Sequence, residues 1–331
     1  MKNEVFIGID VSKLSLDVFI LNKKFHFSVD NKPSGFSRLL EICCTKSSCQ
    51  KNDLRICFEN TGKYSRLLSI FLHDAEITFF QVPALDIKKS RGLIRGKSDK
   101  TDAKDIALYA WRKREELIPT ILHSAEVGIL RQLLTLREKL IKHRTAYKNT
   151  LRDLKDCFYE GETQFIRQTQ QNIINQLNLE IKNVETKMET IINLLPEWKV
   201  NYKLIQTVKG IGPVIAKYMI IYTENFTRFT NHKKFACYAG IAPFEYTSGS
   251  SVKGKTRVHP CANKQLKSLL NMAAMNAIKI NGEYKQYYKR RQELGKNNMS
   301  SLNIIRNKLV ARIFAVVKRQ SPYVDLQKFA A

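Results

Sequence analysis

The chain has 331 residues, with 56 Lys and Arg against 30 Asp and Glu, a formal net charge of +26 and a pI of about 9.8. A charge this large exceeds what an enzyme of small neutral substrates needs, and it makes a polyanion the expected partner. Residues 205–331 alone carry 22 basic and 5 acidic residues, or +17 of the total. We therefore expect the last third of the chain to be the main nucleic-acid-binding region.

Membrane attachment is another explanation for a basic protein, but the sequence does not favour it. No apolar stretch approaches the ~20 residues that a spanning helix needs. The first ten residues contain Lys2, Glu4 and Asp10, so they lack the apolar core of a signal peptide. We expect a cytoplasmic protein without a membrane partner. The seven cysteines form no CxxC pair, which favours reduced thiols over a zinc site.

The first region, residues 1–118, alternates β-type and helical patterns and predicts an α/β domain. The patterns predict strands over 5–11, 16–21, 24–29, 54–59 and 76–82, and helices over 34–45, 64–74 and 102–116. Asp10 stands at the end of the first strand of a predicted three-stranded meander. An Asp in that place is typical of an RNase H-like fold.

Acidic residues follow the predicted strands and begin a predicted helix in this region. Asp10 and Glu59 each end an apolar run, and Asp99, Asp102 and Asp105 lie three residues apart along a basic segment. Carboxylates with this spacing share one face of a helix and repel each other, so a positive group should lie between them. Four acids from separate elements suit hard divalent cations, which prefer oxygen ligands. A single acid at a strand end is also an ordinary turn residue.

Residues 119–204 predict two long antiparallel helices. Apolar residues recur at helical spacing on both sides of a break near 158–163. The pattern is compatible with a helical hairpin that packs on its own molecule, and equally with a protruding coiled coil that dimerises.

The third region, residues 205–331, predicts mainly helices. Val208–Ala216 has a Gly-x-Gly turn before an apolar helix, and in such a helix-hairpin-helix Lys209, Gly210 and Gly212 would hold a phosphate. The segment is also compatible with a plain tight turn.

A short helix is predicted over 229–240, followed by a hydroxyl- and Gly-rich loop over 241–255. Lys253, Lys255 and Arg257 supply phosphate-binding cations there. A serine in such a loop can attack a phosphodiester, or the loop can be a plain turn.

Several motifs, in this order, resemble the DEDD-type transposases of insertion sequences, which are relatives of the Piv DNA invertase and include bridge-RNA-guided serine recombinases. The resemblance runs from about residue 4 to residue 280 and is carried by Gly8–Asp10, Phe58–Gly62, Lys97–Ala103, Val208–Pro213, Tyr238–Pro243 and Thr247–Gly249.

The resemblance implies a RuvC-like N-terminal domain over 1–118, a coiled coil over 119–204 that dimerises, and a C-terminal transposase domain over 205–331. It places the metal-binding acids at Asp10, Glu59, Asp99 and Asp102, with Asp105 as second choice. It places the nucleophile at Ser248. Thr247 stands where a second serine is frequent in the family, and Ser250 and Ser251 follow closely.

The resemblance further implies a Mg²⁺-dependent recombinase, with two ions per site, that cuts and exchanges DNA strands through a phosphoserine intermediate. Its expected partners are double-stranded DNA, a non-coding guide RNA and further copies of itself, from dimer to tetramer. Two other classes remain open. A Holliday-junction resolvase-like nuclease would use the acids with water as the nucleophile, and a DNA-architectural protein would use only the basic surface.

Overall fold

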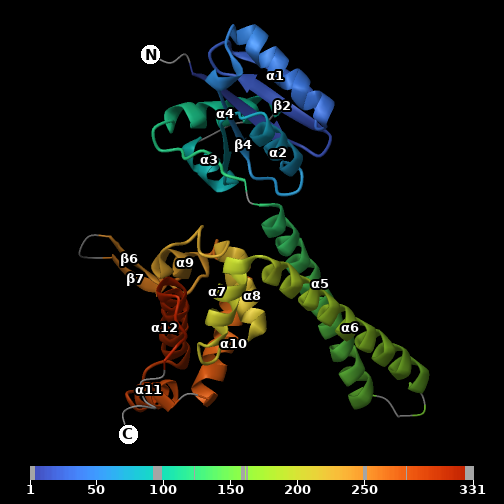
Figure 1. Cartoon of the computed structure of the whole chain (residues 1–331), viewed down its shortest axis with the longest axis vertical. Helices are drawn as coiled ribbons and strands as arrows, with labels where there is room; N and C mark the ends of the chain where they lie inside the picture. The colour runs from blue at the N-terminus through green and yellow to red at the C-terminus, as the bar shows by residue number, and fades with distance from the viewer. Residues whose placement is uncertain are drawn as a thin grey trace. The chain divides into compact units, whose positions relative to one another are not determined.

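The computed structural model describes residues 4–91, 99–122, 124–157, 161, 163–248, 252–280 and 282–324. It divides into two compact units, residues 1–123 and 124–331. The hairpin of long helices groups with the C-terminal helices (Figure 1).

Unit 1 is built on a sheet of five strands in the order β3-β2-β1-β4-β5. Strand β2 is antiparallel to β1 and β3, whereas β4 is parallel to both β1 and β5. The elements are β1 (Val5–Val11), β2 (Ser15–Ile20), β3 (Phe25–Asp30), α1 (Pro33–Ser47), the 3-10 turn η1 (Lys51–Asp53), β4 (Leu54–Glu59), α2 (Arg66–Asp74), β5 (Phe79–Val82), α3 (Ala84–Ser90) and α4 (Asp99–Arg112).

Helices cover both faces of this sheet. Successive residues of a strand point to opposite faces, so the residues of β1 divide between two hydrophobic clusters. The odd-numbered residues of β1, such as Ile7 and Ile9, pack in one cluster with Leu39 of α1 and Leu68 of α2. The even-numbered residue Phe6 belongs to a second cluster with Ile87 of α3 and residues of α4. The sheet is therefore the middle of three layers.

Helix α4 lies directly on β1, and Gly8 permits this close approach. A Cβ on Gly8 would lie 2.1 Å from the carbonyl oxygen of Ala103 and 2.3 Å from the amide nitrogen of Ala107. The small side chains of Ala103 and Ala107 complete the contact and are buried. Only a residue without a Cβ fits between this strand and this helix.

Replacing Gly8 with alanine should destabilise unit 1 by at least about 3 kcal/mol, because the new methyl group collides with backbone that cannot move alone. Urea denaturation of the full chain, followed by circular dichroism, measures the effect. Gly161→Ala is the control, since a Cβ there meets nothing within 4 Å. An unchanged unfolding midpoint for Gly8→Ala would contradict the direct packing of α4 on β1.

Unit 2 contains the remaining helices and a two-stranded hairpin. Its elements are α5 (Ala125–Cys157), α6 (Gln164–Leu194), α7 (Pro196–Gln206), α8 (Pro213–Thr223), α9 (His232–Tyr238), β6 (Phe244–Ser248), β7 (Val252–Arg257), α10 (Lys264–Ile280), α11 (Gly282–Glu293) and α12 (Asn298–Arg319).

The two long helices α5 and α6 run antiparallel, side by side (Figure 1). Arg137 pairs with Glu185 at 2.7 Å, and Arg144 donates to Asn178 further along, so residue numbers rise on one helix as they fall on the other. The prediction of two antiparallel helices is confirmed. The pair of Arg137 with Glu185 joins the two helices of the hairpin to each other. The buried Lys217 of α8 pairs with Glu189 of α6, which ties the hairpin to the other helices of unit 2.

The other helices of unit 2 pack around α8, whose residues Ala216–Ile221 are all buried. The core of this unit draws residues from α5 through α12. A mainly helical C-terminal region is therefore confirmed. In the described residues no helix has both the length and the apolar character needed to cross a membrane.

Several predicted elements differ from the structure, and two of the differences concern the candidate site. The segment 241–255, predicted as a loop, contains most of an antiparallel hairpin in which Thr247 pairs with Lys253 and Ser248 with Val252. A helix predicted over 102–116 begins at Asp99 and ends at Arg112. Strand pairing and the contact with β1 decided these boundaries, and neither is visible in a local pattern.

A candidate site formed by strand-end acids

The two acids at the strand ends lie next to each other in the sheet. β1 and β4 pair in parallel up to Ile9 opposite Phe58, so Asp10 and Glu59 follow as the next residues on adjacent strands. Gly8 and Cys57 lie on the face of the sheet that α4 covers. Asp10 and Glu59 each follow two residues later on the same strand, so they lie on that face too. Both side chains are partly exposed.

Helix α4 runs opposite to β1 and brings its first turn towards Asp10. Phe6 shares a cluster with Ile106 and Ala110, whereas Gly8, two residues further along the strand, faces Ala103 and Ala107. The same progression carries the beginning of α4, from Asp99, towards the end of β1. The sheet and the helix thus bring the backbones of separate acidic segments to one edge. The side chain of Asp99 lies outside the described residues.

Asp102 and Asp105 share a cation, Arg91. Nη1 of Arg91 lies 2.7 Å from Oδ1 of Asp102, and its Nε lies 3.3 Å from Oδ2 of Asp105. Arg91 and Asp102 are mostly buried, so this ion pair is less screened by water than a surface pair. The predicted positive group between the acids is therefore present, but it pairs with Asp102 and Asp105. Sequence reasoning did not single out Arg91.

A further acid, Asp17, was also missed. It pairs with Asp10 across the antiparallel strands β1 and β2, and residues directly opposite each other share a face of the sheet. Its Oδ1 lies 3.1 Å from Nε2 of His26 on β3. No local pattern could have revealed it, because its place beside Asp10 follows from the register of β1 and β2.

The loop after β4 holds the end of that strand in place. The side chain of Asn60 accepts a hydrogen bond from the amide of Gly62 at 3.1 Å, and Gln81 of β5 donates to the same oxygen. Gly62 has a φ of +67°, which glycine adopts without strain. Next to Glu59, burial and the charge of Glu59 raise the pKa of the Cys57 thiol to about 12, which favours the protonated thiol in the free protein.

The donors at this edge suit Mg²⁺ by their chemistry, since all of them are carboxylates. Within the described part of the chain, no three His, Cys, Asp or Glu side chains are close enough together to form a complete metal cluster. Asp10 and Glu59 are the pair that the sheet register places together. Asp102 would have to exchange Arg91 for a metal ion.

The predicted nucleophile, Ser248, is the last residue of β6. Its backbone is described, but its side chain and those of Lys253 and Lys255 lie outside the described residues, as do Ser250 and Ser251 entirely. The acids belong to unit 1 and Ser248 to unit 2.

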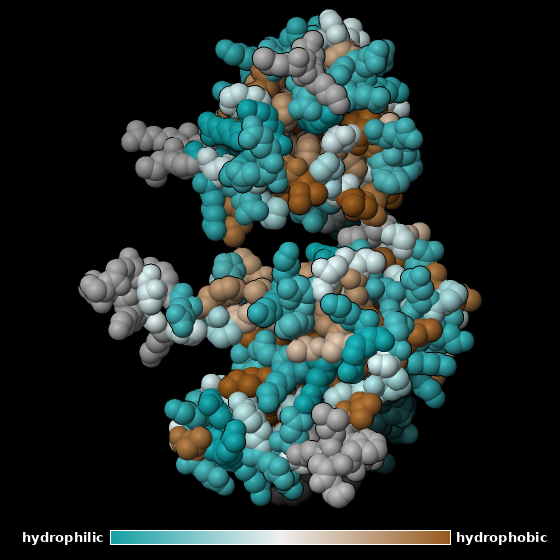
Figure 2. All heavy atoms as spheres, turned by 60° about the vertical axis from the view of Figure 1, so that its left-hand side comes forward, coloured by the Kyte–Doolittle hydropathy of each residue, from teal (hydrophilic) through white to brown (hydrophobic). Residues whose placement is uncertain are grey.

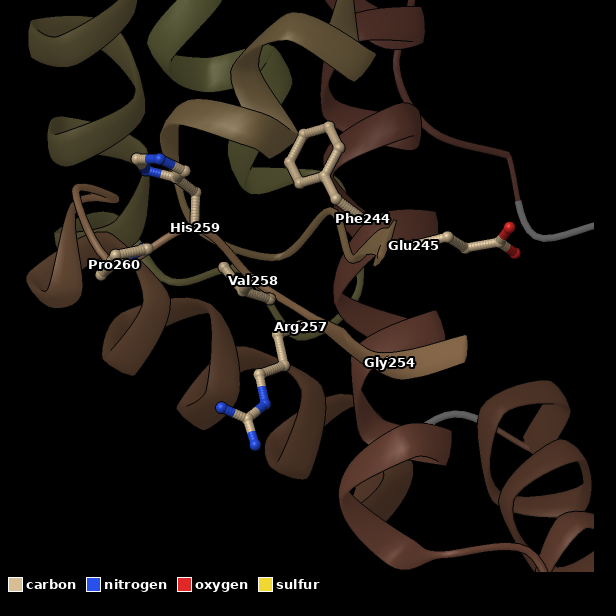
Figure 3. A pocket seen from close by; sticks show the side chains of 7 residues that line it. All are labelled: Phe244, Glu245, Gly254, Arg257, Val258, His259 and Pro260. Atoms are coloured by element: carbon tan, nitrogen blue, oxygen red, sulfur yellow. The ribbon is translucent and has the colours of Figure 1, made fainter. Parts of the chain in front are cut away.

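At the base of this hairpin, Arg257 pairs with Phe244. The two side chains point to opposite sides of the ribbon, and His259 lies on the side of Phe244 (Figure 3). A pocket of about 480 Å³ opens here, and Phe244, Glu245, Gly254, Arg257, Val258, His259 and Pro260 line it. The exposed guanidinium of Arg257 is therefore available to a ligand at the base of the hairpin.

The Gly-x-Gly segment forms a tight turn between α7 and α8. Gly210 has a φ of +92°, and a Cβ there would lie 2.7 Å from Cβ of Ala277 on α10. This glycine therefore serves both the turn and the packing. Gly212 precedes Pro213 at the start of α8 and has open space around it. Lys209 is half-buried.

Hydrophilic residues predominate on the face of the chain shown in Figure 2.

Two family models, both of IS110-type transposases, match successive parts of the chain. One, of DEDD transposases of the IS110 type, matches residues 7–159, and the other, the transposase IS116/IS110/IS902 family, matches residues 202–289. The chain belongs to this family of insertion-sequence transposases, whose members are enzymes of DNA strand transfer.

Relatives agree with this assignment. The pilin gene-inverting proteins of Moraxella lacunata and Moraxella bovis are each 25% identical to this chain, over 97% of it and 98% of their own length. An uncharacterized 43.6 kDa protein of insertion element IS110 from Streptomyces coelicolor is 25% identical over 40% of this chain and 32% of its own length.

Proposed function

We propose that this protein is the Mg²⁺-dependent, RNA-guided recombinase of an insertion sequence, and that it exchanges DNA strands through a covalent phosphoserine intermediate. The observation that carries the proposal is the adjacency of Asp10 and Glu59 at the ends of β1 and β4, with the acidic start of α4 directed towards them. The strand order β3-β2-β1-β4-β5, with only β2 antiparallel to its neighbours, supports an RNase H-like, RuvC-like domain in unit 1.

Asp10, Glu59, Asp99 and Asp102 are the residues that would hold two Mg²⁺ ions. Bound there, the ions would lower the pKa of a hydroxyl and stabilise the charge that develops on the phosphate. Asp105 would keep Arg91 as its partner when Asp102 turns to the metal, because Arg91 contacts both acids.

Ser248 is the proposed nucleophile. Attack by its Oγ forms a bond to phosphorus and breaks the bond from phosphorus to the 3′ oxygen, which leaves as a hydroxyl after taking a proton. The serine proton passes to a carboxylate or to water. Attack by a different 3′ hydroxyl then reverses the step and frees the serine, so two DNA ends are rejoined without an external energy source.

Basic residues of unit 2 would hold the nucleic acid. Lys253, Lys255 and Arg257 of the hairpin and the turn Lys209, Gly210 and Gly212 are the proposed phosphate contacts, with backbone amides at the start of α8 among the donors. Base pairing to the guide RNA would read the sequence, and the protein would recognise the duplex by its backbone and shape.

We also propose that the hairpin of α5 and α6 joins two copies of the chain, on the way to a tetramer. Several large apolar side chains on these helices are exposed, among them Ile129, Leu136, Phe165, Ile166 and Leu179. Burying such residues against a second copy would stabilise a dimer. The inversion activity in the names of the Moraxella relatives is consistent with strand exchange by such an assembly.

One strand-transfer assay tests both the reaction and its guidance. Protein purified with its bound RNA, of the order of 10² nucleotides, should join DNA strands carrying the ends of its element when Mg²⁺ is present. Joining should stop when the RNA is removed by nuclease and return when that RNA is added back. Recovery of only heterogeneous RNA, with joining unaffected by nuclease, would refute the guide.

A further inference from the structure

Three cationic side chains in unit 2 are almost completely buried. Arg137, Lys217 and Arg306 are 8%, 4% and 3% exposed. Arg137 is compensated by Glu185 at 2.7 Å, and Lys217 by Glu189 at 2.9 Å. This is the usual state of a buried charge, because an unpaired one is expensive to remove from water.

Arg306 lacks such compensation. Its Nε is enclosed and has no hydrogen-bond partner, and no acid among the described residues forms an ion pair with it. Burial lowers the pKa of this guanidinium, and no neighbouring charge offsets the effect. An arginine stays protonated even so, which means that α12 carries a buried positive charge without a counter-ion.

Arg306 lies on the part of α12 that is hydrogen-bonded to the segment just before the hairpin that carries Ser248. It lies in the middle of α12, between Asn303 and Asn307, whose side-chain amides donate to the carbonyl oxygen of Ile241 at 2.8 and 2.9 Å. Ile241 precedes β6 by three residues. The part of α12 that holds the start of the hairpin therefore also contains the uncompensated cation.

We propose that Arg306 binds a backbone phosphate of the nucleic acid. Only Nε of Arg306 is among the enclosed atoms without a partner, so a terminal N–H can donate a charge-assisted hydrogen bond to a phosphate oxygen. A phosphate is favoured over a carboxylate of a second copy because cations outnumber acids by 56 to 30 in the whole chain and by 22 to 5 in residues 205–331. Arg306 also lies beyond residue 289, where the family match ends. The proposal rests on nucleic-acid binding in the proposed function and not on its chemistry.

The test compares stability with affinity, because the proposal expects the two to move in opposite directions. In Arg306→Met the uncompensated charge is replaced by an apolar side chain of similar length, so the free protein should melt about 2–4 °C higher. The same variant should bind a labelled DNA or RNA duplex about tenfold more weakly. Its log affinity should also depend less steeply on log salt, by about one phosphate contact.

Two variants serve as matched controls. Arg137→Met removes an equally buried cation that has an acid partner, so it should lower the melting temperature. Lys182→Met removes one charge from the exposed surface of α6 and should change affinity by no more than about twofold. Weakening on the DNA duplex alone or the RNA duplex alone identifies the source of the phosphate.

A lower melting temperature or failure to fold in Arg306→Met would show that the guanidinium is structural and would overturn the proposal. Unchanged affinity and salt dependence on both duplexes would overturn it too. If the wild-type chain bound neither duplex, the proposed function itself would fail, which is a separate outcome.

Discussion

Replacement of Ser248 with alanine should abolish strand exchange, with a loss of about 10⁴-fold or more, because no other group supplies the covalent intermediate. Stability should change by less than about 0.5 kcal/mol, since the substitution removes one oxygen at the end of a β-hairpin. Affinity for DNA and RNA should be unchanged. A strand-exchange assay, a melting curve and a binding titration of the same preparation measure the three quantities.

The neighbouring residue provides the matched control for this variant. Thr247→Ala also removes a hydroxyl from β6, one residue earlier, and alternate residues of a strand point to opposite faces. It should retain activity. Loss of exchange in Thr247→Ala with full activity in Ser248→Ala would identify Thr247, not Ser248, as the nucleophile. Activity in both would direct attention to Ser250 or Ser251.

Replacement of Asp10 or Glu59 with the corresponding amide should reduce DNA cleavage by about 10³-fold or more, because several kcal/mol of transition-state stabilisation depend on the metal ions. Nucleic-acid binding should persist, since affinity comes from the basic surface. The variants keep the shape of the acids and leave the sheet intact. Cleavage of labelled DNA, measured over a series of Mg²⁺ concentrations, gives the result.

Asp102 and Asp105 can be separated in the same assay. Asp102→Asn should be inactive, whereas Asp105→Asn should retain most activity because Asp105 pairs with Arg91 and holds no metal ion in the proposed site. The reverse pattern would make Asp105 the fourth ligand. Full activity of Asp10→Asn and Glu59→Gln, or cleavage that resists metal chelation, would contradict the metal site altogether.

Local pattern predicted the parts of the candidate site that depend on single strands. Asp10 and Glu59 end apolar runs that form β1 and β4, as expected from their composition. Their adjacency depends on the parallel pairing of these strands, which no local pattern contains. Asp17 was missed for the same reason, because its place beside Asp10 follows from the register of β1 and β2.

Long-range contacts explain the remaining differences. Arg91 pairs with Asp102. A cation near the acids was expected from the sequence, but several lysines and arginines lie close to them in the chain, and the sequence does not show which one forms the pair. The serines and glycines of the hairpin of β6 and β7 are residue types typical of turns, so its local sequence predicts a loop and does not show the strand pairing. Arg306 could not be identified at all, since an isolated arginine in a helix is usually a surface residue, and only its burial makes it unusual.

The most direct test of the central claim is to trap the covalent intermediate. Protein, labelled target DNA, bound RNA and Mg²⁺ are mixed, the reaction is denatured, and any protein band that carries label is digested and mapped. The account predicts one labelled peptide, with the DNA attached to Ser248, in the wild type and none in Ser248→Ala. Efficient metal-dependent cleavage without any protein–DNA adduct would contradict it and would indicate a resolvase-like nuclease that uses water.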